Sequence, residues 1–378
     1  MTVRTASRAL LLAILMGLVA AAPAAAERRV PFGFFAVHWS HELAAAPAEV
    51  QDAQFALMAR SGVEAIRTDF NWASNQQLPG DPIDFSRFDR TVAGAAAHGI
   101  EVLPVVNEAP RWARAYPWRE KSPPRDPGDF AAMLGELVER YGPNGSFWAE
   151  HPELPEWSIR EWQIWNEPHL RSYWDAPERG PYGYLKAYGT LLRRSHRAIK
   201  SRDPRARVVL AGITQRAWEE IEEMYRVGRI KGAFDAAALQ IFPQTVRRAR
   251  IATQLFRAAL NARGDRRKPI YITEISWPAS RGRTPRVRWL AHETPRTMAA
   301  KLGEAYAVLA RRRRTLGLER VYWFTWASQY GRGGSVFNYA GLQQYRDGKF
   351  TPQPALEAFR RRAIELQGCE KTETGDCL

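Results

Sequence analysis

The chain has 378 residues, with 55 lysines and arginines against 40 aspartates and glutamates, so its formal charge is +15. It is long enough to bury a large core, either as two ordinary domains or as one large barrel. Its two cysteines, Cys369 and Cys377, exclude a cysteine-rich metal site, and in an oxidising compartment they can close a disulfide in the polar tail 367–378.

The first 26 residues have the pattern of a signal peptide. Arg4 and Arg8 precede the apolar run 9–22, and the small residues that follow end at Ala26. A basic segment, an apolar segment and an A-x-A-like site predict cleavage near Ala26 and export to the periplasm or the medium. The alternative is an uncleaved anchor, for which the apolar run is short. We therefore expect a secreted or periplasmic protein without stable membrane insertion.

Eight apolar, β-branched or aromatic runs predict strands. They cover residues 32–39, 63–70, 100–107, 160–167, 206–213, 234–243, 269–276 and 319–327. Helical periodicity follows each run, at residues 48–61, 85–98, 128–141, 182–201, 216–227, 246–262, 295–314 and 354–367. The helical segments exclude a β-sandwich, and a doubly wound open sheet would not need eight units. The pattern predicts an α/β protein with a single-domain (β/α)8 TIM barrel over residues 27–366.

Two of the predicted strands end in a glutamate, namely Glu167 in WQIWNEP and Glu274 in YITEISWP. Active sites of such barrels lie at the carboxyl ends of the strands, so side chains from strands four and seven can converge there. Two carboxyl groups about 5 Å apart carry out retaining glycoside hydrolysis. A single glutamate at a strand end is more often a surface charge. Two of them beside tryptophans favour catalysis, because burial is costly for a charge without a partner.

The residues around these glutamates resemble the clan A glycoside hydrolases, which are retaining TIM-barrel enzymes, and families 5 and 39 in particular. Asn166 and Glu167 match the Asn-Glu pair of that clan, and Glu274 matches its strand-seven nucleophile. The stretch 140–169 and the ending GLQQYRDGKFTPQPALEAF are similar to bacterial members. The resemblance implies cleavage of an O-glycosidic bond by double displacement, without a cofactor, with Glu167 as the acid/base and Glu274 as the nucleophile.

The resemblance also implies residues that bind the substrate. Arg67 in IRTDFNW is similar to the strand-two arginine that hydrogen-bonds the nucleophile, and Trp326 in VYWFTWAS is similar to the strand-eight tryptophan beneath the cleaved sugar. Asn166 can donate to a sugar 2-hydroxyl, a contact that strengthens in the transition state. The alternatives are a salt bridge inside the barrel for Arg67 and a strand-ending cap for Asn166.

Tryptophans gather at the predicted strand ends, where flat apolar rings can stack on sugars. We expect sugar contacts from Trp112, Trp118, Trp277 and Trp326. Core packing is the alternative for all of them, and it is the interpretation we prefer for Trp162, Trp165 and Trp323. His38, at the end of the first strand, is expected to line the site wall as a hydrogen-bonding residue.

Strand six departs from the pattern of the clan. Many members end this strand with a histidine or tyrosine that lines the site, but here AALQIFPQ offers Gln240, Phe242 and Gln244. The second hydrogen bond to Glu274 is therefore unassigned, with Gln240 and Tyr322 as candidates. The alternative function is a catalytically inactive sugar-binding barrel or surface interaction protein, and only this departure favours it.

The basic charge bears on the partners. Removing residues 1–26 takes away two arginines and no acids, which leaves +13. Such a charge favours anionic partners and suggests an acidic exopolysaccharide as the carbohydrate substrate, although the fold alone also allows neutral β-glucans, mannans or xylosides. A solvated basic surface is the interpretation we prefer for the arginines. The arginines are dispersed rather than gathered in a nucleic-acid motif, so we expect no nucleic acid partner. The histidines form no H-E-x-x-H motif. We expect no metal and a monomer.

Overall fold

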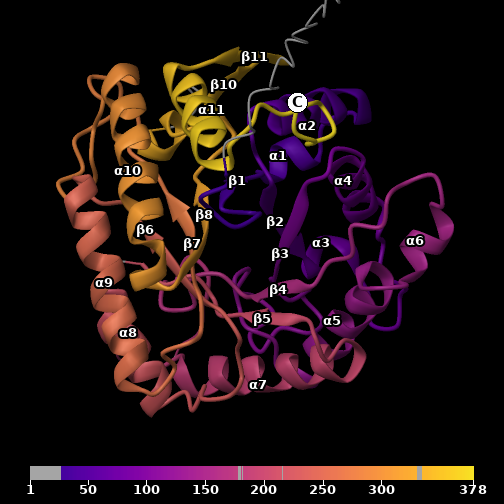
Figure 1. Ribbon diagram of the computed structural model, residues 1–378. Helices are drawn as coiled ribbons and strands as arrows, with labels where there is room; N and C mark the ends of the chain where they lie inside the picture. The colour runs from indigo at the N-terminus through magenta and orange to yellow at the C-terminus, as the bar shows by residue number, and fades with distance from the viewer. Residues whose placement is uncertain (1–26, 178–179, 181, 215, 330–333) are drawn as a thin grey trace, which may run out of the picture.

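The computed structural model describes residues 27–177, 180, 182–214, 216–329 and 334–378. The signal peptide expected over residues 1–26 lies outside this part of the chain. Within the described residues, eight parallel strands form a ring that helices surround (Figure 1), which confirms the predicted single-domain (β/α)8 fold.

The strands of the ring run in the order β5-β4-β3-β2-β1-β8-β7-β6. Their bounds are β1 (Phe35–His38), β2 (Ala65–Asn71), β3 (Glu101–Asn107), β4 (Glu161–Ile164), β5 (Arg207–Val209), β6 (Ala237–Ile241), β7 (Ile270–Ile275) and β8 (Leu318–Trp323). Two isolated parallel bridges, Val209 with Ala236 and Ile213 with Leu239, join the edge strands β5 and β6. These bridges close the ring.

The helices cover the outside of the ring. The longer ones are α2 (Ala48–Arg60), α4 (Ser86–Ala97), α5 (Pro127–Tyr141), α7 (Leu185–Arg202), α8 (Ala217–Arg226), α9 (Val246–Ala262), α10 (Pro295–Leu316) and α11 (Pro354–Gln367). Short helices are α1 (His41–Ala44), α3 (Trp72–Asn75), α6 (Ser146–Glu150) and the 3-10 helix η1 (Val336–Tyr339). Each longer helix lies where periodicity predicted it.

Capping residues explain several helix boundaries. The Asp126 side chain accepts the Gly128 N–H at the start of α5, and Thr294 forms a capping box with Thr297 at the start of α10. At its other end α10 stops at Gly317, whose φ of 61° is left-handed. Glycine takes this conformation without the steric cost of a Cβ atom, so the chain can turn directly into β8.

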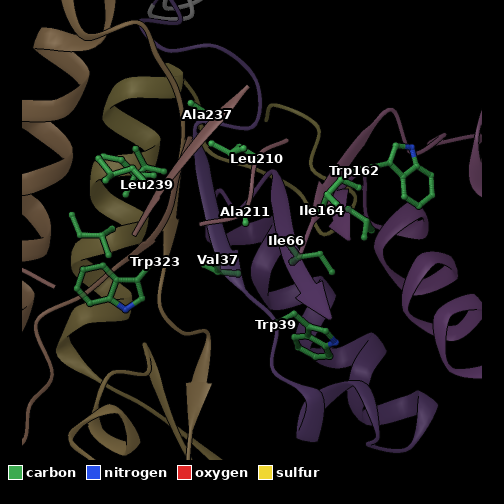
Figure 2. Packing of buried hydrophobic residues seen from close by; sticks show 14 of the residues in the cluster. Val37, Trp39, Ile66, Trp162, Ile164, Leu210, Ala211, Ala237, Leu239 and Trp323 are labelled. Carbon is green, nitrogen blue, oxygen red and sulfur yellow. The ribbon is translucent and has the colours of Figure 1, made fainter. Parts of the chain in front are cut away.

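The main core lies between the strands and the helices, and Figure 2 shows its packing around Val37, Ile66, Ile164, Leu239 and Trp323. Strand residues alternate between this core and the inside of the ring. A second buried cluster fills the inside with mostly small residues, namely Ala36, Ala65, Leu103, Val209, Ala236, Ala238, Tyr271 and Tyr322. The preferred interpretation of Trp162, Trp165 and Trp323 as core residues agrees with their burial.

The chain after β8 differs from the prediction. The eighth strand was expected to reach Ala327, but β8 stops at Trp323. Ala327 belongs to β9 (Ala327–Ser328), which forms a small separate sheet with β10 (Gln343–Arg346) and β11 (Lys349–Pro352). Asp347 and Gly348, with φ of 50° and 78°, make the tight turn between β10 and β11. This Asp-Gly pair is a typical hairpin signal.

The C-terminal tail packs against the amino-terminal end of the barrel. Cys369 and Cys377 are joined by a disulfide. Inside the loop that it closes, the Glu373 carbonyl accepts a hydrogen bond from His98 Nδ1 at 2.7 Å. A Cβ atom at Gly99 would come within 2.6 Å of the Thr374 carbonyl. The tail therefore lies at the end of the barrel away from the strand ends of the candidate site. No helix in the described ranges is long and apolar enough to span a membrane.

Candidate active site

A cavity of about 940 Å³ lies at the carboxyl ends of the barrel strands. The predicted site residues that line it are His38, Arg67, Asn166, Glu167 and Glu274. His38 and Glu274 lie at the ends of β1 and β7, Asn166 and Glu167 follow β4, and Arg67 lies within β2. The fold therefore brings these residues, which lie far apart in the sequence, to one place.

Arg67 is the centre of the polar network beneath the cavity. Its Nη1 donates to Glu274 Oε1 at 2.9 Å, its Nη2 to Asn166 Oδ1 at 2.8 Å and its Nε to Gln163 Oε1 at 2.9 Å. The side chain is only 2% exposed. Because the guanidinium holds its donors in a rigid plane, these three bonds fix the relative positions of Glu274 and Asn166.

Gln240 supplies the contact that strand six left unassigned. Its Nε2 donates to Glu274 Oε1 at 2.8 Å and to Asn166 Oδ1 at 2.9 Å. Tyr322, the other candidate, belongs to the buried cluster inside the ring. The amide of Gln240, one of the two candidates, thus makes this contact, and it holds the same two residues as Arg67.

A register shift between β6 and β7 brings Gln240 and Glu274 together. Leu239 pairs with Ile272, but the next residue, Gln240, pairs with Glu274. The extra residue, Thr273, changes the face to which Glu274 points, as β-bulges do next to many active sites. Strict alternation from the inward-facing Tyr271 would have turned Glu274 toward the helices.

These bonds determine which atoms remain for a ligand. Asn166 Oδ1 accepts from both Arg67 and Gln240, so the Asn166 Nδ2 group is left as a donor. Glu274 Oε1 likewise accepts from both residues, so Oε2 is the oxygen left for chemistry. At the floor of the cavity, Asn166 therefore presents a hydrogen-bond donor and Glu274 presents a nucleophilic oxygen.

The backbone around Glu167 is strained. Trp165 has φ of 68° and Glu167 has φ of 40°, both in the left-handed region that residues with a Cβ atom rarely adopt. Each such residue costs on the order of 1–3 kcal/mol. The Trp165 N–H still bonds the Val106 carbonyl at 2.9 Å, so the strand end remains anchored while the next residues turn. Both Asn166 and Glu167 consequently line the cavity.

The two glutamates differ in their surroundings. Burial raises the pKa of Glu167 to about 8, and the charge of Glu274 contributes to this rise. Burial also raises the pKa of Glu274 to about 7, but the Arg67 guanidinium opposes that rise. None of the described residues donates a hydrogen bond to the Glu167 carboxyl group, whereas Glu274 accepts two. Glu274 therefore ionises first, while Glu167 keeps its proton.

His38 is a neutral residue of the cavity lining. Burial lowers its pKa to about 3, and the charge of Arg67 acts in the same direction. The Thr325 hydroxyl donates to the His38 carbonyl at 2.8 Å, so it can only accept from Nδ1, 3.3 Å away. Nδ1 thus carries the proton and Nε2 is an acceptor. No group of three or more His, Cys, Asp or Glu residues in the described chain has the arrangement of a metal site.

The expected tryptophan contacts need correction. Trp326 and Trp277 are fully buried. Trp112 packs edge-on against Trp72, with 5.4 Å between the ring centroids. None of these three expected contacts, Trp112, Trp277 and Trp326, lines the cavity. The indole of Trp326 donates to Gln54 Oε1 at 3.0 Å, away from any ligand. The reason is that β8 ends at Trp323, so the residue that follows, Phe324, lines the cavity in place of Trp326.

Other lining residues were missed by the sequence analysis. Asp69 and Asn107 come from the ends of strands two and three, and Asn107 Nδ2 donates to Asp69 Oδ1 at 3.0 Å. Their strand-end positions were a readable signal. Tyr173 lies in an irregular loop, where no pattern pointed to it. Burial raises the pKa of Tyr173, as do the charges of Glu274 and Glu167, so its hydroxyl stays protonated beside them.

Comparisons with known proteins show a similarity of fold. No family model and no curated protein sequence matches the chain. Solved structures that are similar to this chain include glycoside hydrolases of family 39 and of the clan A type. A family 39 glycoside hydrolase from Bacteroides cellulosilyticus WH2 has a TM-score of 0.62 and 17% identity, covering 90% of this chain and 64% of the other.

Two further neighbours give the same result. A family 39 β-xylosidase from Caulobacter crescentus has a TM-score of 0.62 and 17% identity, covering 89% of this chain and 72% of its own. An exo-β-1,4-mannosidase from Opitutaceae bacterium strain TAV5 has a TM-score of 0.60 and 14% identity, and the match covers 92% of this chain and 62% of the mannosidase. The chain thus spans about two thirds of these proteins, and at such low identity the similarity establishes the fold alone.

Proposed function

We propose that the protein is a retaining O-glycoside hydrolase that cleaves a poly- or oligosaccharide by double displacement. The observation that carries this proposal is the unequal pair in one cavity. Glu274 is bound by Arg67 and Gln240, which favour its ionised form, while Glu167 is buried without a hydrogen-bond donor, which favours its protonated form. A nucleophile and an acid need these two states at one pH.

In the first step, Glu274 Oε2 attacks the anomeric carbon while the bond from that carbon to the leaving oxygen breaks. Glu167 gives its proton to that oxygen, and the sugar remains as an ester on Glu274. In the second step, Glu167, now ionised, takes a proton from water, and the resulting hydroxide displaces Glu274. The Asn166 Nδ2 group donates to a sugar hydroxyl, and His38 Nε2 accepts from another.

The test of this mechanism replaces each glutamate. We expect Glu274→Ala to abolish turnover of an aryl glycoside, and azide to restore part of it by forming a glycosyl azide of inverted configuration. Glu304→Ala is the matched control, because Glu304 is exposed on α10 and does not line the cavity. Full hydrolytic activity in Glu274→Ala would refute the assignment, and labelling of Glu274 by a 2-fluoro glycoside would support it.

The alternative of a catalytically inactive barrel rested on a missing contact to Glu274. Gln240 supplies a donor at that position, 2.8 Å from Glu274 Oε1. No other feature of the described residues favours the inactive alternative. We therefore retain hydrolysis as the proposed function.

We further propose that the substrate is an acidic exopolysaccharide and that the protein is exported as a monomer. The net charge, which is +13 without residues 1–26, and two of the arginines in the cavity lining, Arg216 and Arg248, support an anionic substrate. Screening acidic and neutral glycans at low and high salt tests this, because screening weakens binding of an anionic chain. Amino-terminal sequencing and sedimentation of the exported protein test the cleavage site and the monomer.

A further inference from the structure

The cavity has two walls of different chemistry. Between β4, which Glu167 follows, and β7, which carries Glu274, the ring can be followed through β5 and β6 or through β3, β2, β1 and β8. On the longer way, β1, β2 and β3 contribute what we call the polar wall, with the residues His38, Asp69, Asn107 and Glu108, while Phe324 and Phe337 line the cavity after β8. The shorter way, with the loop after β7, contributes what we call the basic–aromatic wall, with the residues Arg216, Trp218, Phe242, Arg248 and Trp289.

The polar wall and the floor offer no free cation among the described lining residues. Each of the three nitrogens of Arg67 already donates to a neighbour, and this residue is 2% exposed. His38 is neutral because burial lowers its pKa to about 3. Asp69 and the ionised Glu274 add negative charge. A sugar carboxylate in this place would be desolvated and repelled, whereas hydroxyl groups find a donor in Asn166 and an acceptor in His38.

The basic–aromatic wall has the opposite character. Arg248 is solvent-exposed, and its Nη1 donates to Gln244 Oε1 at 2.6 Å, with no carboxylate in ion-pair range among the described residues. Gln244 in turn donates to the Arg288 carbonyl at 2.8 Å, which ties the loop after β7 to this wall. That loop reads SRGRTPRVRW and ends in Trp289, which is 59% exposed. Arg216 forms an ion pair with the nearby Glu219.

The hydrogen-bonding groups determine which part of a glycan meets each wall. The sugar that Glu274 attacks needs partners for its hydroxyls, and Asn166, His38, Asp69 and Asn107 lie on the floor and the polar wall. The unit that leaves with the proton of Glu167 then meets the remaining wall. His169, just after Glu167, contacts the Thr214 hydroxyl at 2.8 Å, so the loops after β4 and β5 adjoin there.

We propose that the basic–aromatic wall binds an anionic sugar unit on the leaving-group side of the scissile bond, while the polar wall takes an uncharged sugar unit. This inference rests on the proposed hydrolase function and adds where the charge of the substrate lies. Arg248 supplies a planar donor pair suited to a carboxylate or sulfate. Trp218 and Trp289 supply flat faces for the sugar ring.

The experiment compares two leaving groups on one neutral sugar, chosen as a glycoside that the wild type hydrolyses. The 3-carboxyumbelliferyl and 4-methylumbelliferyl glycosides differ in the negative charge of the leaving unit, and kcat/KM is measured for both. We expect Arg248→Gln to lower the ratio of the carboxylated to the neutral substrate about fivefold, the size of one exposed charge pair. Salt should lower the wild-type ratio similarly. Because the same ratio is compared between the variant and the wild type, the intrinsic difference in reactivity between the two leaving groups cancels.

Arg312→Gln is the matched control, because Arg312 is an exposed arginine near the end of α10 and does not line the cavity. It should leave the ratio unchanged. The inference is overturned if Arg248→Gln leaves the ratio unchanged or if Arg312→Gln lowers it equally. It is also overturned if a glucuronide or galacturonide of methylumbelliferone is cleaved faster than every neutral glycoside, since the charged sugar would then occupy the polar wall.

A binding measurement separates this inference from the function on which it rests. If the wild type neither hydrolyses an umbelliferyl glycoside nor is labelled by a 2-fluoro glycoside, the hydrolase proposal fails. Binding of an oligogalacturonate and of a cello-oligosaccharide of equal length, measured by calorimetry, still tests the basic–aromatic wall. We expect the acidic oligomer to bind more tightly than the neutral one. Arg248→Gln should lower the ratio of the two affinities about fivefold. Equal binding of the two oligomers by the wild type would overturn the inference.

Discussion

Gly212 lies directly against the side chain of Gln240. A Cβ atom at position 212 would come within 2.4 Å of Gln240 Cδ and 2.5 Å of Nε2. Gly212 also forms a parallel bridge with Asn166, so the same glycine adjoins both ends of the Gln240–Asn166 hydrogen bond. The missing side chain at position 212 is what allows the Gln240 amide to reach Glu274.

Gly212→Ala should therefore reduce catalysis without unfolding the protein. The added methyl group pushes the Gln240 amide away from Glu274, and a misplacement of about 1 Å can cost on the order of 100-fold in rate. The measurement is kcat/KM on an aryl glycoside together with Tm. Gly303→Ala in α10 is the control, because nothing lies within 4 Å of a Cβ atom there. Equal activity of the two variants would contradict the role given to Gly212.

Gln240→Met should shift the pH dependence of kcat/KM. This substitution keeps the volume but removes the donor to Glu274 Oε1, and the loss of a hydrogen bond to the ionised form raises the pKa of Glu274. Such a bond contributes about 1.5–3 kcal/mol, so the acidic limb of the profile should move up by roughly one pH unit. A lower rate with an unmoved acidic limb would mean that Gln240 acts only in packing.

The wild-type profile of kcat/KM should be bell-shaped. Activity needs Glu274 ionised and Glu167 protonated, and their pKa values of about 7 and about 8 place the optimum between the two. Because the carboxyl groups interact, the limbs report the pair rather than either residue alone. In Glu167→Gln, tested with a leaving group that needs no proton, the basic limb should disappear. Its persistence would assign that limb to another group.

Glu167 should also lower stability at high pH. Burial raises its folded-state pKa to about 8, above that of an unfolded chain, so the folded protein binds more protons between these values. The free energy of unfolding then falls as pH rises through that window. Glu167→Gln, which stays neutral, should raise Tm at pH 8 by at least about 2 °C and have a smaller effect at pH 5. A larger gain at pH 5 would contradict this sign.

The eight strand–helix units were predictable because their periodicity is regular and their helices carry clear end signals. The strand ends placed Glu167, Glu274 and His38 at one face by the same reasoning, since parallel strands end at one face. Arg67, which lies within β2, and Asn166 were predicted from the resemblance to the clan. What could not be predicted is the register shift at Thr273. That shift is a local irregularity of hydrogen bonding, and no pattern in YITEISWP marks it.

The errors after β8 have a different origin. The apolar run continues through Trp326, so the sequence contains no sign that β8 stops at Trp323 and that Phe324 reaches the cavity. The turn formed by Asp347 and Gly348, in contrast, was a readable signal.

Tyr173 and Trp289, which also line the cavity, lie in irregular loops before β8, where neither strand nor helix periodicity applies.

An amide beside Glu274 has a consequence for adapting this protein. Gln240 neither gains nor loses a proton at any physiological pH, and His38 is already neutral, so the acidity of the medium acts on the network mainly through the two glutamates. A single change to histidine at position 240 would add a third protonation equilibrium beside Glu274. The pH range over which the site operates is thus adjustable through one residue that needs no contact with a substrate.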